Sequence, residues 1–113
     1  MKDSNNTIIF RDLDKVRFII KDAAALDVAY AYDDLVFSED AVFIIQYHET
    51  DPDIFKCWFN VECYEPVKQQ ILNNLSTTAR LNKLQINYAG TFELLESEEG
   101  KNETFKLKFM AGE

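Results

Sequence analysis

The stretch 41–64 constrains the fold of this chain more than any other part of the sequence. Two segments rich in aromatic and β-branched residues, 41–49 and 55–64, flank an acidic break that contains Pro52. This pattern predicts an antiparallel hairpin. Because side chains alternate along a strand, its second arm has a buried face and an outer face. We expect the buried face to carry Phe55, Cys57, Phe59, Val61 and Cys63, and the outer face Lys56, Trp58, Asn60, Glu62 and Tyr64.

Apolar residues recur at helical spacing in two segments. The first, with Leu13, Val16 and Ile20, predicts a helix over about 11–25. The second follows Pro66, a residue favoured at the first position of a helix. Its apolar stripe is formed by Val67, Ile71, Leu72 and Leu75, and we expect Ser76, Thr77 and Thr78 to end or kink the helix.

Alternating segments predict the remaining strands. Residues 28–37 alternate but are interrupted by Asp33 and Asp34, so they form one bent strand or two short ones. The last third of the chain is typical of a hairpin. Leu84, Ile86, Tyr88, Phe92 and Leu94 are expected to share one face, with Phe105, Leu107 and Phe109 facing inward from the other arm. Pairing Leu94 with Leu107 also brings together Phe92 with Phe109 and Glu93 with Lys108.

The resulting element order is α-β-β-β-α-β-β. It predicts one α+β domain over residues 1–113, frayed at 1–6, with two helices on one face of a two-layer, mainly antiparallel five-stranded sheet. A chain of this length buries enough surface for one core without a metal or a disulfide. The order is similar to that of type III secretion chaperone-like domains, which are also small and acidic, although the closing helix of that fold has no counterpart here.

The chain carries 20 acidic and 12 basic residues, a formal net charge of −8. Its scattered basic residues argue against binding to nucleic acid or to an anionic membrane surface, because both require clustered Lys and Arg. The acidity serves either solubility or the recognition of a basic partner. No apolar span is long enough for a transmembrane helix and the N-terminus lacks the apolar core of a secretory signal, so we expect a cytoplasmic protein.

No catalytic or metal-binding motif stands out. Three glycines cannot form a glycine-rich phosphate loop, and one histidine with two cysteines cannot complete a zinc site. Cys57 and Cys63 are expected to be small buried side chains in a reducing compartment. His48 is expected to be a half-exposed strand residue and not a general base, since no partner for it is marked. The sequence therefore predicts neither an enzyme nor a cofactor.

The outer face of the central hairpin is the most informative candidate surface. Trp and Tyr are enriched at protein interfaces, and acidic turns would surround them. We expect a protein-binding module, of the immunity, inhibitor or secretion-chaperone kind, that docks a basic partner. Two alternatives remain. In the first, this face is covered by the chain's own N-terminus or by a second copy in a homodimer. In the second, the protein is a small-ligand-binding domain or minor enzyme with a pocket between sheet and helices, to which Tyr30, Tyr32, Tyr47 or His48 contributes polar groups. The predicted partner-binding residues are Trp58, Tyr64, Asp33, Asp34, Glu39, Asp40, Asp51 and Asp53.

Overall fold

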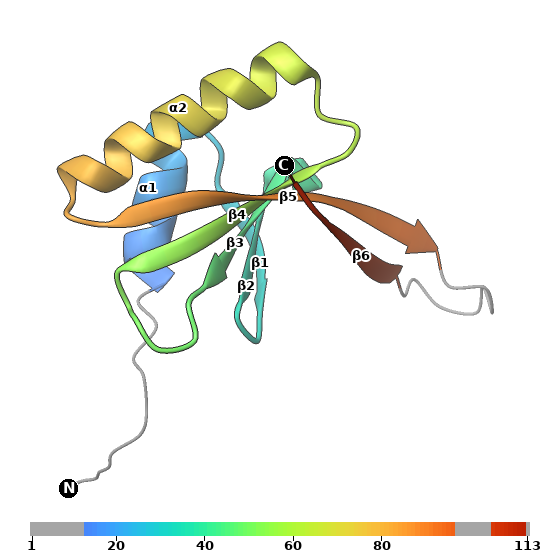
Figure 1. Cartoon of the computed structure of the whole chain (residues 1–113), viewed down its shortest axis with the longest axis horizontal. Helices are drawn as coiled ribbons and strands as arrows, with labels where there is room; N and C mark the ends of the chain where they lie inside the picture. Colours follow the sequence, from blue (N-terminus) through green and yellow to red (C-terminus); the bar gives the residue numbers. More distant parts are fainter. Residues whose placement is uncertain (1–12, 97–104, 113) are drawn as a thin grey trace, which may run out of the picture.

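The computed structural model describes residues 13–96 and 105–112 and has an α+β architecture (Figure 1). The expected fraying at 1–6 lies outside the described residues. Along the chain the elements are α1 (Leu13–Ala24), β1 (Val28–Tyr32), β2 (Leu35–Ser38), the short 3-10 turn η2 (Glu39–Ala41), β3 (Phe43–Tyr47), β4 (Ile54–Asn60), α2 (Glu65–Leu81), β5 (Gln85–Glu96) and β6 (Phe105–Ala111).

Within residues 13–96 and 105–112 the sheet has six strands in the order β1-β2-β3-β4-β5-β6, so every strand lies beside its neighbour in sequence. All neighbouring pairs are antiparallel except β4 and β5, which are parallel because α2 carries the chain back across the sheet between them. The predicted five-stranded sheet is therefore one strand short. Asp33 and Asp34 form a turn that divides residues 28–37 into β1 and β2, and Asp33 has a left-handed φ of 58°, which aspartate tolerates.

Both helices pack on the same face of the sheet, as Figure 1 shows, and they are joined to each other by hydrogen bonds. Thr78 Oγ1 donates to Asp22 Oδ2 at 3.0 Å, and Asn74 Nδ2 donates to the carbonyl oxygen of Ala23 at 3.1 Å. The expected break at 76–78 is wrong: α2 continues to Leu81 because Thr78 faces α1. The core between the layers includes Val16, Ile19, Ile20, Phe43, Ile45, Phe55, Cys57, Phe59, Leu75 and Ala79.

The strand expected over 55–64 ends earlier than its alternation suggested. β4 stops at Asn60, whose side-chain Oδ1 accepts a hydrogen bond from the Glu62 N–H at 2.9 Å. The N–H of Cys63 donates to the carbonyl oxygen of Asn60, also at 2.9 Å, and this closes a turn. Tyr64 is then the residue that precedes α2. Trp58 and Tyr64 consequently do not share a strand face.

A bulge at Gly90 divides β5 into two halves that face opposite ways. Cys57 is registered with Tyr88 but Trp58 with Gly90, so β5 contains one extra residue at this point. Gly90 has a φ of 146°, and a Cβ there would overlap the carbonyl oxygen of Met110 on β6. The bulge therefore requires glycine.

The extra residue reverses the side chains that follow it. Ile86 and Tyr88 face the helices, whereas Phe92, registered with Asn60 of β4, faces the other side of the sheet. The prediction that Leu84, Ile86, Tyr88, Phe92 and Leu94 share one face is wrong for this reason. The predicted pairs Leu94 with Leu107, Phe92 with Phe109 and Glu93 with Lys108 are all confirmed.

Candidate functional site

The sheet face turned away from the helices, called here the outer face, is rich in aromatic side chains. One register row crosses all six strands and contains Tyr30, Phe37, Ile44, Trp58, Gly90 and Ala111. Ile44 and Phe92 are fully buried on this side although both described helices pack on the opposite face. The large neighbouring side chains must therefore cover them, and the outer face carries a thin apolar layer of its own.

Trp58 lies in the middle of the outer face and is held by both polar and aromatic contacts. Its indole Nε1 donates to Gln46 Oε1 at 3.0 Å, and Gln46 Nε2 in turn donates to Asp34 Oδ2 at 2.9 Å. The Phe109 ring lies with its centroid 4.6 Å from that of Trp58. The half-buried indole is thus fixed in place, and it is connected to an acidic residue of the β1–β2 turn.

Two tyrosines of β1 form the most exposed part of the outer face. The rings of Tyr30 and Tyr32 stack with centroids 6.5 Å apart and an interplanar angle of 10°. Tyr30 also meets Phe37 of β2 edge-on, at 5.5 Å. Tyr30 is 57% and Tyr32 65% exposed, and the chain continues from Tyr32 directly into Asp33 and Asp34. An exposed aromatic surface therefore borders an acidic turn.

The eight predicted partner-binding residues fall into two groups at opposite ends of the sheet. Asp33 and Asp34 join β1 to β2, and Asp51 and Asp53 join β3 to β4; in an antiparallel meander these two turns lie at the same end. The N–H of Tyr47, the last residue of β3, donates to the Asp34 carbonyl oxygen at 2.9 Å, so the β1–β2 turn is bonded to the end of β3. Trp58 is joined to this group through Gln46. The other end holds Glu39, Asp40 and Tyr64.

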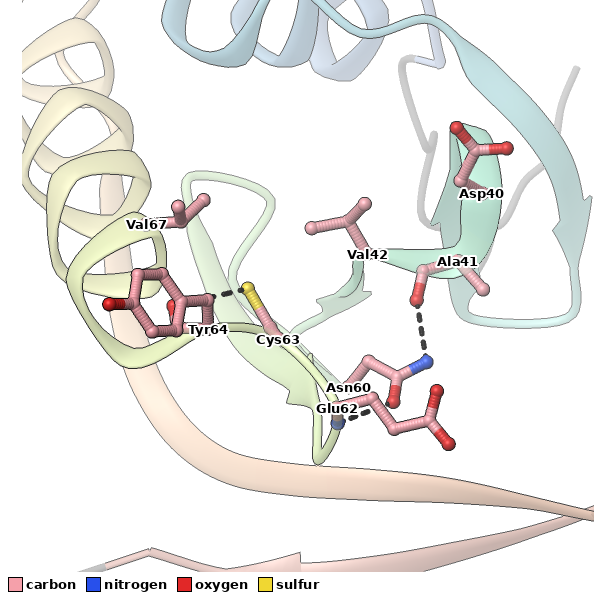
Figure 2. A pocket seen from close by; sticks show the side chains of 8 residues that line it. All are labelled: Asp40, Ala41, Val42, Asn60, Glu62, Cys63, Tyr64 and Val67. Carbon is pink, nitrogen blue, oxygen red and sulfur yellow. Dashed lines mark hydrogen bonds between the residues drawn. The ribbon is translucent and has the colours of Figure 1, made fainter.

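Asp40 and Tyr64 of the second group line a hollow of about 290 Å³ between η2, the end of β4 and the start of α2 (Figure 2). Asn60 Nδ2 donates to the Ala41 carbonyl at 3.0 Å across one side of it. Burial raises the pKa of the Cys63 thiol, which makes this cysteine a weaker nucleophile at neutral pH. The hollow is lined by Asp40, Ala41, Val42, Asn60, Glu62, Cys63, Tyr64 and Val67.

His48 has a structural role in the turn between β3 and β4. Its Nδ1 accepts hydrogen bonds from the N–H groups of Thr50 at 3.1 Å and Asp51 at 2.9 Å. Asp51 Oδ1 then accepts from the Asp53 N–H at 2.9 Å. These side chains organise the loop backbone. Within 13–96 and 105–112, no group of three or more His, Cys, Asp or Glu residues is placed to hold a metal ion.

The tyrosines proposed for a pocket between sheet and helices do not converge. Tyr30 and Tyr32 lie on the outer face, whereas the buried Tyr47 belongs to the core under the helices. Of these residues, Tyr47 and His48 line a common hollow, of about 260 Å³, and it also contains Asp34, Gln46, Glu49 and Lys56. No helix in the described parts of the chain is long and apolar enough to cross a membrane.

Four aromatic residues of the outer face were missing from the predicted partner-binding residues, although the small-ligand alternative includes Tyr30 and Tyr32. Tyr30, Tyr32 and Phe37 are on strands whose alternation was visible, but alternation alone does not say which face the helices cover. Phe109 was expected to face inward, and the bulge at Gly90 places it beside Trp58 instead.

Comparison with protein-family models, curated proteins and solved structures found no match. The similarity in element order to type III secretion chaperone-like domains therefore gains no support from them, and the function has to be argued from the site itself.

Proposed function

We propose that this protein is a small acidic, cytoplasmic, non-catalytic protein-binding module that docks a basic protein partner on its outer face. Immunity proteins, inhibitors and secretion chaperones are the functional classes that work in this way. The observation that carries the proposal is the exposed tyrosine pair of β1 next to the acidic turn at 33–34.

Aromatic and acidic groups together fit a partner rich in Lys or Arg. A tyrosine ring buries a large area at the cost of few rotatable bonds, and its face attracts a guanidinium or an ammonium group. Asp33 is exposed beside Tyr32, so a cation docked on the rings also meets a carboxylate. The net charge of −8 attracts the same partner over a longer range.

The outer face is also organised before any partner arrives. Trp58 is fixed by Gln46 and Phe109, and the stacked tyrosines restrict each other. Docking on side chains that are already ordered loses less conformational entropy, which favours affinity.

Affinity capture from the native cytoplasm tests this proposal. The bait is the tagged full chain, compared with a Tyr30→Ser, Tyr32→Ser double variant and with a Phe18→Ser control, which changes an aromatic residue of α1 that is 55% exposed. We expect a stoichiometric basic partner with the wild type and the control, and its loss with the double variant. Failure to recover a stoichiometric partner, or equal loss from both variants, would refute the proposal.

Charge is tested separately by Asp33→Asn, with Asp14→Asn on α1 as the matched control. Asp33→Asn should slow association with the captured partner and reduce its salt dependence, because charges at an interface mainly affect the association rate. Asp14→Asn should leave both unchanged.

The alternative is a small-ligand-binding domain or minor enzyme that uses the hollow at the start of α2. It has apolar groups from Val42 and Val67 and polar ones from Asp40 and Asn60, but its volume of about 290 Å³ is at the lower limit for ligand sites. A Val67→Trp substitution, which would fill the hollow, should abolish ligand binding under this alternative and leave partner capture intact under the main proposal.

A further inference from the structure

We propose that the free edge of β1 accepts an extended segment of a partner protein as an additional strand, and that this segment carries Lys or Arg at both of its ends. This inference rests on the proposed function and specifies how the basic partner binds. β1 is the first strand of the sheet, and within the described residues it has a strand neighbour, β2, on one side only. Such an edge presents unpaired backbone N–H and C=O groups that can receive another strand.

β1 is open on both of its faces as well as along its edge. Ala31, registered with Val36, is exposed on the side of the helices, and Tyr30 and Tyr32 are exposed on the outer face. An added strand would therefore be able to pack on both faces of its neighbour. A register shift between Val28 and Tyr30 leaves Tyr30–Tyr32 as the regular part of the β1–β2 pair.

The two edges of the sheet differ in their protection against pairing. β6, at the other edge, carries the exposed Lys106 and Lys108 in its middle. Lysines on an edge strand discourage association with other strands. β1 has the sequence Val-Ala-Tyr-Ala-Tyr, with neither a charged residue nor a proline. Among the strands that the structure describes, the β1 edge is thus the one without such protection.

Acidic residues stand at both ends of β1. Asp27 precedes the strand and is partly neutralised by Lys21, with Nζ and Oδ2 3.9 Å apart. Asp33 and Asp34 follow it, and Asp33 is exposed. A segment with a basic residue at each end and an uncharged middle is complementary to this arrangement.

The same charges argue against a second copy of this chain as the occupant. Antiparallel self-pairing centred on Tyr30 would place Asp27 of each copy opposite Asp33 of the other. Like charges that face each other across two strands are destabilising. Each copy also has a net charge of −8.

The fitting segment is short and alternating. A strand that matches β1 spans five residues, or about 17 Å at a rise of about 3.3 Å per residue. The side chains next to Ala31 can be bulky and apolar because this alanine leaves space. Those on the other face adjoin the tyrosine rings.

A synthetic peptide provides the test, with the full-length protein in solution. The probe is Lys-Lys-Ile-Thr-Ile-Thr-Ile-Lys-Lys. One matched control has Glu in place of every Lys, and the other keeps all side chains but is N-methylated throughout its core, so it cannot donate backbone hydrogen bonds. Amide hydrogen exchange read by NMR reports on β1 residue by residue.

We expect the lysine peptide to slow exchange of the outward-pointing amides in Val28–Tyr32, and the N-methylated peptide to have no such effect. The glutamate peptide should bind at least about tenfold more weakly at low salt, because its charges are repelled at both ends of the strand. This difference should shrink from about 0.01 M to about 1 M NaCl, where the Debye length falls from about 30 Å to about 3 Å. Asp33→Asn should weaken binding of the lysine peptide, and Asp14→Asn should not.

Three results would overturn the inference. Unchanged exchange in β1 at millimolar peptide would exclude strand addition. Resonance shifts at Trp58 and Phe109 without slower exchange in β1 would mean that the outer face binds side chains only, which leaves the proposed function standing. A mass that doubles with protein concentration while β1 becomes protected would identify a second copy as the occupant. The proposed function fails by a different observation, the absence of a stoichiometric partner in the capture experiment.

Discussion

Ser38 illustrates how a single buried hydroxyl determines a local structure. Its Oγ accepts hydrogen bonds from the N–H groups of Val42 and Phe43, each at 3.1 Å, and donates to the Glu39 carbonyl at 3.2 Å. The residue is fully buried at the end of β2. The hydroxyl therefore holds the tight connection from β2 through η2 into β3.

Replacing Ser38 by alanine should lower the free energy of unfolding by about 1–3 kcal/mol, because the buried N–H of Phe43 loses this acceptor and the N–H of Val42 keeps only its longer bond, 3.4 Å, to the Glu39 carbonyl oxygen. Urea denaturation measures this change. Thr77→Ala, which removes an exposed hydroxyl from α2, is the matched control and should lower the stability far less. Equal losses in the two variants would contradict the role given to Ser38.

Lys68 is a lysine whose pKa is raised by its contacts in the fold. Its Nζ lies 3.2 Å from Glu65 Oε1 and 3.4 Å from the Tyr88 hydroxyl, and its side chain is only 14% exposed. Burial lowers the pKa of Lys68, but the hydrogen bonds to Glu65 and Tyr88 outweigh it, so this pKa lies above its ordinary value of 10.5. The folded state thus binds this proton more tightly than the unfolded state does.

A raised lysine pKa stabilises the fold below the unfolded-state value and loses this effect as pH rises through the folded-state value. The free energy of unfolding should therefore decrease above pH 10.5, and less steeply in Lys68→Met than in the wild type. Unfolding curves across the alkaline range measure the two slopes. Parallel curves for wild type and Lys68→Met would contradict the role given to the hydrogen bonds of Lys68.

At the scale of elements, β6 depends on the bulge at Gly90 for its contact with Trp58. Phe109 reaches the indole because β5 reverses its faces at Gly90 and β6 follows it. Trp58 is the only tryptophan of the chain, so its fluorescence reports on this packing directly.

Phe109→Ala should shift the emission of Trp58 to longer wavelength and increase its quenching by acrylamide, because the indole gains water contact. The stability should fall by about 1 kcal/mol or more, since an aromatic pair contributes about 0.5–1.5 kcal/mol beyond the area it buries. Phe18→Ala, on the exposed side of α1, should leave the emission unchanged. Identical spectra for both variants would mean that β6 does not cover Trp58 in solution.

The β5–β6 hairpin also marks how far the sequence could predict the fold. The register of Leu94 with Leu107 follows from alternation on both arms, and it is confirmed. The face on which this hairpin packs could not be derived, because Gly90 signals a bulge but not the direction in which the chain turns. A single inserted residue reverses everything after it.

The predicted end of β4 was wrong because the alternation of apolar and polar residues continues past Asn60, where the strand ends. Val61 and Cys63 extend the apolar pattern of Phe59, yet Asn60 closes a turn with its own side chain. Asparagine favours such turns, and this was the available signal. The parallel pairing of β4 with β5 was likewise readable in principle, since strand, helix and strand in succession favour a parallel crossover.

At the scale of the whole molecule, the two faces of the sheet have different roles: one stabilises the fold, and the other is proposed to bind the partner. The face under α1 and α2 contains the main core. The outer face has only a thin apolar layer, and its tyrosines stay exposed. Cys57 and Trp58, adjacent on β4, point to these two sides and so offer separate probes of them.

Cys57 should react with a thiol reagent only when the whole domain unfolds. Its side chain is fully buried in the core, and burial raises the pKa of its thiol, so neither access nor thiolate is available in the folded state. In a Cys63→Ser background, labelling of Cys57 then measures global opening.

The Ser38→Ala substitution connects this rate to stability. A loss of about 2 kcal/mol raises the unfolded fraction about 30-fold, and the labelling rate of Cys57 should increase by the same factor. Thr77→Ala should label at nearly the rate of the parent. Similar rates in all variants would mean that Cys57 is reached by local opening of β4, and the core would then not unfold as one unit.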